Sequence, residues 1–164
     1  MTTLQSLVFD DDTFVKALLE EDELGAVIRC HIHIESAIDR LIKNSVTDYS
    51  QILKMHLDYF QKIHLAAAIA LPAEYISPLA SLGKIRNKFA HNLDTKISKS
   101  SMNDLYKSFS PRQKELIQIA FKNTKTKLPP KDKNKIPDLT PKDQLSIYSM
   151  ALRIQILATA LALE

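Results

Sequence analysis

A short stretch near the middle of the chain, RNKFAH, carries the residues best suited to chemistry: Arg86, Asn87 and His91. Arginine stays charged at any working pH, and its planar guanidinium fits phosphate oxygens. Histidine is the side chain whose ordinary pKa lets it give and take protons near neutrality. An arginine, an amide and a histidine this close together favour work on a phosphodiester.

The helix that holds these residues limits how they can cooperate. Five residues turn through about 140° on an ideal helix, so Arg86 and His91 do not share a stripe. Asn87 and His91, at i and i+4, do share one. We expect Asn87 to orient the imidazole while Arg86 reaches the groove from its edge, with a second copy of the motif from a symmetric partner completing the site. The alternative is structural: Arg86 pairs with an acid, and His91 caps the helix C-terminus.

Two further features bear on this site. Gly83 lies inside the same helix, where glycine costs about 1 kcal/mol relative to alanine, so it predicts a close approach by a neighbouring segment. His31, Glu35 and Asp39 form an i, i+4, i+8 row on an earlier helix. We expect this row to face the motif, with Glu35 orienting His91 or pairing with Arg86. A buried polar bridge that fixes helix register, or a solvated flank, is the alternative.

Other histidines and the single cysteine point away from metal chemistry. His31 and His33 are about 200° apart on a helix and cannot share one ion. No second Cys/His cluster is present to complete a zinc site, so we expect neither a metal nor a cofactor. Cys30 is expected to be a small buried hydrophobe. His64 is expected to be a hydrogen-bonded core histidine.

Composition and periodicity predict an all-α protein. The chain has 164 residues, 45% of them apolar and 25% charged, and only two glycines. Apolar residues recur at spacings of three and four, which indicates amphipathic helices. We expect one domain over 1–164, a bundle of five to seven helices. The expected helices begin near Phe14 and then cover about 24–42, 49–71 (one helix or two), 78–91, 111–123 and 141–163.

Three Ser/Thr-Pro pairs predict helix starts, because a hydroxyl caps the helix and proline suits its first position. They are Ser77-Pro78, Ser110-Pro111 and Thr140-Pro141. The last of these helices is apolar on nearly all sides, so it lies either in the core or at a subunit interface. The preceding segment, about 124–140, is rich in lysine and proline and is expected to be a surface loop.

Charge and targeting signals indicate where the chain works. Residues 84–142 carry fifteen Lys or Arg against five acids, a bias that could attract a polyanion. The N-terminus resembles no signal peptide, and the longest apolar tract, 65–71, is too short to span a bilayer. We therefore expect a cytoplasmic protein without membrane contact.

The segment LGKIRNKFAHN resembles the signature of the HEPN superfamily, an arginine, a polar residue and a histidine within R-x4-6-H. The helix pair around it also resembles the mannitol-operon-repressor-like (MtlR-like) helical proteins. The resemblance covers roughly residues 14–93. HEPN domains are all-α, and many are metal-independent endoribonucleases that act as dimers, often as toxins or phage-defence effectors.

The resemblance implies roles for individual residues. Arg86 would bind the scissile phosphate, Asn87 would orient the phosphate or the imidazole, and His91 would transfer a proton. Lys84 and Lys88 would contact substrate phosphates. The partners implied are RNA, a second copy of the chain and an antitoxin or regulatory protein. The alternative is a non-catalytic MtlR-like regulator that acts through protein–protein contacts. A third possibility keeps the same groove but binds a nucleotide without cleaving RNA.

Overall fold

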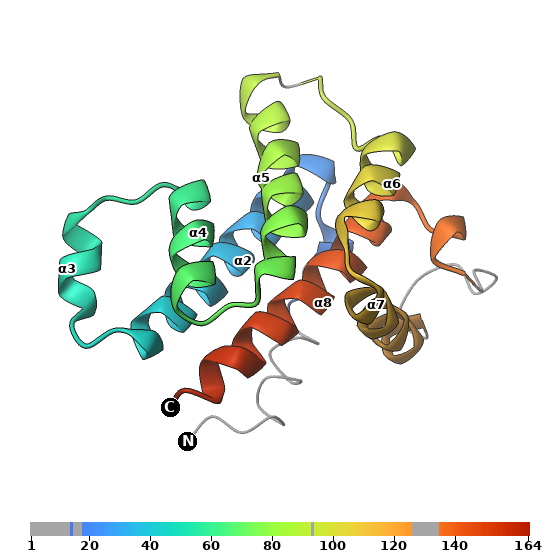
Figure 1. Ribbon diagram of the computed structural model, residues 1–164. Helices are drawn as coiled ribbons and strands as arrows, with labels where there is room; N and C mark the ends of the chain where they lie inside the picture. The colour runs from blue at the N-terminus through green and yellow to red at the C-terminus, as the bar shows by residue number, and fades with distance from the viewer. Residues whose placement is uncertain (1–13, 15–17, 93, 126–134) are drawn as a thin grey trace.

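The computed structural model describes Phe14 and residues 18–92, 94–125 and 135–164. Every regular element in this part of the chain is helical (Figure 1). The elements are α2 (Glu23–Ser45), α3 (Tyr49–Lys54), α4 (Tyr59–Ile69), the 3-10 turn η1 (Ala73–Tyr75), α5 (Ile76–His91), α6 (Lys99–Ser108), α7 (Pro111–Thr124), the 3-10 turn η3 (Ile136–Asp138) and α8 (Pro141–Leu161).

The expectation of an all-α bundle is confirmed. Seven α-helices have described bounds. One more helical segment, seen at Phe14 and 18–20, precedes them, so the described residues hold one helix more than the upper end of the expected five to seven. The run over 49–71 forms two helices, α3 and α4. The helix α6 was not predicted, although its apolar residues Met102, Leu105 and Tyr106 recur at helical spacing.

Helices α2 and α8 form the centre of the bundle and run side by side in the same direction (Figure 1). Near their N-terminal ends, Lys142 Nζ donates to the carbonyl oxygens of Leu19 and Glu21 at 3.1 and 2.7 Å. Near their C-terminal ends, Asn44 Nδ2 donates to the carbonyl oxygen of Ala160 at 2.9 Å. Most of α8 is buried, so the apolar C-terminal helix completes the core of this chain.

Helices α4 and α5 form an antiparallel hairpin that packs on α2. The Tyr59 hydroxyl at the start of α4 donates to the carbonyl oxygen of Leu79 at 3.0 Å. A Cβ added at Gly83 would lie 2.7 Å from Tyr59 Cε1 and 3.0 Å from Phe60 Cζ. The close approach predicted from Gly83 is therefore confirmed, and it brings the first turn of α4 against α5.

Two of the three predicted helix starts are confirmed. The Ser110 hydroxyl accepts from the Gln113 amide and Gln113 Oε1 accepts from the Ser110 amide, which makes a capping box. The Thr140 hydroxyl accepts from the Asp143 amide. Ser77 is not a cap, because α5 begins at Ile76, directly after η1, and has no side-chain cap.

One further sequence expectation is corrected by the structure, and another falls mostly on residues that it does not describe. His64 is exposed on α4, so its prediction as a core histidine is wrong: the buried face of that helix carries Tyr59, Ile63 and Ala66 instead. Most of the predicted Lys/Pro loop, residues 126–134, lies outside the described residues. In the described ranges, no helix combines the length and apolar character needed to cross a membrane.

Candidate functional site

An open pocket of about 370 Å³ lies where α2, α4 and α5 meet. It is lined by two residues of α2, the start of α4 and two residues of α5: His31, Glu35, Asp58, Tyr59, Phe60, Arg86 and Asn87. Five of these side chains are ionisable. The pocket therefore gathers groups from positions 31 to 87 that the sequence left on separate helices.

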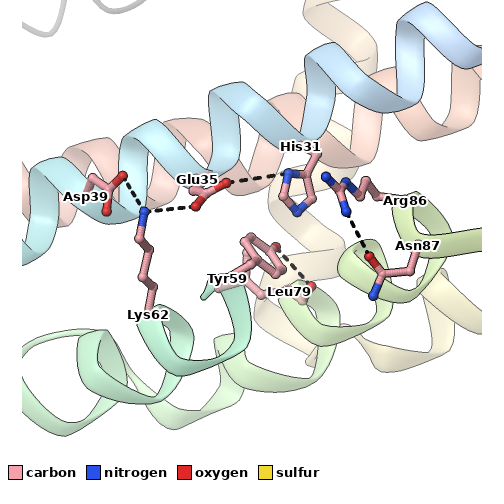
Figure 2. A network of polar contacts seen from close by, with 8 residues as sticks. All are labelled: His31, Glu35, Asp39, Tyr59, Lys62, Leu79, Arg86 and Asn87. Carbon is pink, nitrogen blue, oxygen red and sulfur yellow. Dashed lines mark hydrogen bonds and ion pairs between the residues drawn. The ribbon is translucent and has the colours of Figure 1, made fainter. Parts of the chain in front are cut away.

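A lysine on α4 ties the acidic row of α2 together (Figure 2). Lys62 Nζ lies 2.8 Å from Glu35 Oε1 and 2.9 Å from Asp39 Oδ2. Partial burial lowers the pKa of Lys62, but Glu35 and Asp39 together raise it by more, so the net pKa is raised and the lysine stays charged. Asp39 is occupied by this ion pair and does not line the pocket.

His31 has two close neighbours at the pocket, Glu35 and Tyr59. Its Nδ1 lies 3.7 Å from Glu35 Oε2, and its ring packs on Tyr59 with a centroid distance of 4.3 Å. Burial lowers the pKa of His31, and the positive charges of Arg86 and Lys62 lower it further, while Glu35 opposes them. The imidazole therefore favours its neutral form near pH 7.

Arg86 reaches the pocket without a carboxylate partner among the described residues. Its NH1 donates to Asn87 Oδ1 at 3.2 Å, and no ion pair to it is found (Figure 2). The expected pairing of Glu35 with Arg86 is wrong, because the Glu35 carboxylate forms its ion pair with Lys62. The guanidinium keeps donors available for an anion that enters the pocket.

The other motif residues lie on a different side of α5. His91 is the last residue of the helix and is exposed, as are Lys84 and Lys88. Positions 84, 88 and 91 fall within about 60° of one another on an ideal helix, so they form one solvent-facing stripe. Asn87 lies between this stripe and Arg86. Within one chain, His91 does not line the pocket, and Glu35 is engaged with His31 and Lys62 rather than with His91.

Sequence reasoning missed Lys62 and did not connect His31 with Arg86. A signal for Lys62 was available: it is the only Lys or Arg in α4. A single lysine on an otherwise uncharged helix suggests an ion pair with a neighbouring helix. Glu35 and Asp39 were two carboxylates available for that pair. No spacing rule places His31 beside Arg86, because the helix crossing decides that contact.

Cys30 and His33, the other residues of types that bind metals on α2, contact the core rather than the pocket. Cys30 is fully buried, and burial raises the pKa of its thiol to about 12. His33 packs against Phe14 with a centroid distance of 4.4 Å, on a different side of α2 from His31. In the described ranges, no group of three His, Cys, Asp or Glu side chains is arranged to hold a metal ion.

The chain matches no protein-family model, no curated protein and no solved structure. The chemistry of the pocket therefore has to be inferred from its own residues.

Proposed function

We propose that this protein is a metal-independent endoribonuclease of the HEPN type, acting as a homodimer and serving as a toxin or phage-defence effector. Arg86 binds the scissile phosphate, Asn87 orients it, and His91 transfers a proton. Lys84 and Lys88 contact neighbouring phosphates, which fixes the strand without reading its bases.

The observation that carries this proposal is the state of Arg86. The guanidinium lines an open pocket, hydrogen-bonds only to Asn87 and has no carboxylate partner in the described part of the chain. A structural arginine at such a half-buried position is normally neutralised by an acid, because an unpaired charge loses solvation. An arginine left available is suited to bind a phosphate through two parallel hydrogen bonds.

The reaction is a transesterification that needs no metal. The RNA 2′-oxygen attacks the adjacent phosphorus as it loses its proton, and the bond from phosphorus to the 5′-oxygen breaks. The leaving 5′-oxygen takes up a proton, and the products are a 2′,3′-cyclic phosphate and a 5′-hydroxyl. Arg86 stabilises the charge that develops on the phosphate oxygens. DNA lacks the attacking 2′-hydroxyl and is not cleaved.

The test compares wild type with His91→Ala, using growth and RNA integrity in cells and cleavage of purified RNA. His64→Asn is the matched control, since His64 is also an exposed helical histidine but lies outside the motif. We expect wild type and His64→Asn to degrade RNA and His91→Ala to be at least about a hundredfold slower. Intact RNA with purified wild type, free of any inhibitor, would refute the nuclease.

The second candidate is a non-catalytic regulator of the MtlR-like kind that acts through protein contacts. The observation in its favour is α3, which has no buried residue and lies at one edge of the bundle (Figure 1). Leu53 on α3 and Met55 directly after it are each 60% exposed. Large apolar side chains left open to solvent on an edge helix are available for contact with a partner protein.

The two candidates differ in which substitutions matter. For a regulator, Leu53→Lys with Met55→Lys abolishes the cellular effect, while His91→Ala leaves it unchanged. For a nuclease, His91→Ala removes the effect and purified wild type cleaves RNA without a partner. Growth and RNA integrity measured on both variants therefore separate them.

A further inference from the structure

We propose that His31 is a second proton-transfer residue of this site, the general base that accepts the proton of the 2′-hydroxyl, and that Glu35 positions it. This inference rests on the proposed ribonuclease function and deepens it. Each chain would then hold the phosphate-binding arginine and the base in one pocket, and the site would not depend on a second subunit to supply the base.

The chemistry of the reaction calls for two proton-transfer groups. One group must take the proton of the 2′-oxygen while another gives a proton to the departing 5′-oxygen. These two oxygens lie on opposite sides of the phosphorus in an in-line displacement. The R-x4-6-H motif of one chain contains a single histidine, so a second group has to come from elsewhere.

His31 meets the geometric requirement for that group. It lines the same pocket as Arg86 and Asn87, and Figure 2 shows its imidazole beside the Arg86 guanidinium. Asn87 lies between Arg86 and His91 around α5. A phosphate held by Arg86 and Asn87 would therefore have His31 on the α2 side and His91 on the opposite, solvent-facing side.

His31 also has the surroundings of a prepared base. Its ring packs on Tyr59, and the Glu35 carboxylate lies 3.7 Å from Nδ1, close enough to stabilise a positive charge on the imidazole. Glu35 is itself anchored by Lys62 at 2.8 Å. Arg86 and Lys62, the two cations that face the imidazole, favour its neutral form, and a neutral imidazole is the form that accepts a proton.

The proton balance closes with these residues. Neutral His31 takes the 2′-hydroxyl proton as the new P–O bond forms, and protonated His91 gives a proton to the 5′-oxygen as the old P–O bond breaks. His31 leaves the step protonated and His91 neutral, so exchange with water resets both. Glu35 stabilises the imidazolium of His31 as it forms.

The test is the pH profile of RNA cleavage for wild type, Glu35→Gln and Lys62→Met. Loss of the Glu35 carboxylate lowers the pKa of His31 further, so the acid limb of kcat/KM moves to lower pH. Loss of the Lys62 charge raises that pKa, so the limb moves to higher pH. A purely structural network predicts no such opposite shifts, and an acid limb that stays in place in both variants would overturn the assignment.

A second arm measures turnover and binding separately. We expect His31→Asn to lower kcat by about a hundredfold to ten-thousandfold while binding of a 2′-O-methyl RNA, which cannot be cleaved, stays within about threefold of wild type. Circular dichroism confirms that the variant folds, and His64→Asn again serves as the control. Cleavage by wild type with full activity in His31→Asn overturns this inference alone. Absence of cleavage by wild type overturns the proposed function itself.

Discussion

Replacing Gly83 with alanine tests how closely α4 and α5 pack beneath the pocket. The new Cβ would lie 2.7 and 2.9 Å from Tyr59 Cε1 and Cδ1, and 3.0 Å from Phe60 Cζ. Carbon atoms in good contact are about 3.5–4.0 Å apart, so the ring or the helix must move by about 1 Å. Tyr59 cannot move freely, because it is buried and its hydroxyl is bonded to the Leu79 carbonyl.

The expected magnitude is the difference between two opposing effects. Overpacking of this kind costs about 1–3 kcal/mol. Alanine regains about 1 kcal/mol of helix propensity over glycine. We therefore expect Gly83→Ala to lower the free energy of unfolding by about 0–2 kcal/mol. For a chain of this size each kcal/mol corresponds to about 2–4 °C in Tm.

Urea and thermal unfolding measure the effect, with Gly25→Ala as the matched control. Gly25 is also helical, but its added Cβ would meet the ends of the Glu21 and Asp22 side chains rather than a buried ring, and the exposed pair of Glu21 with Arg29 can shift to make room. Gly25→Ala is expected to be neutral or to stabilise by up to about 1 kcal/mol. If Gly83→Ala raised Tm as much as Gly25→Ala does, the close contact of α5 with Tyr59 would be wrong.

Three further predictions concern folding energetics. The pKa of His31 is lower in the folded state than in the unfolded state, so the unfolded chain binds this proton first as pH falls. Wild type should therefore lose more stability than His31→Gln between about pH 7 and pH 5, measured by urea titration. Equal losses in the two proteins would contradict this. Ser110→Ala should cost about 1 kcal/mol by removing the α7 cap, whereas Ser110→Asp should restore most of it, both measured by Tm. Ile156→Ala, inside α8, should cost about 2–5 kcal/mol in urea unfolding, against less than about 0.5 kcal/mol for the exposed Leu163→Ala, and similar costs would show that α8 is not the core helix.

The limits of the sequence are visible at particular elements. Helix α2 was predictable because its apolar residues recur at spacings of three and four over 23 residues. The starts of α7 and α8 were predictable because Ser110 and Thr140 carry local chemistry that needs no tertiary partner. The start of α5 was not, because its first turn continues from η1 and Ser77 has no capping role. Helix α6 was missed although Met102, Leu105 and Tyr106 recur at helical spacing.

The sequence by itself determined the helical class, the two strong caps, and the positions of Arg86, Asn87 and His91 along one helix, since these depend on residue type and local spacing. It also predicted the close approach at Gly83, because glycine inside a helix is costly without a reason. Only the tertiary structure decided that α8 completes the core and that Lys62 forms ion pairs with Glu35 and Asp39. It also decided that His31, rather than His91, shares the pocket of Arg86. Those contacts depend on how helices cross, and the crossing is set by packing between residues far apart in the chain.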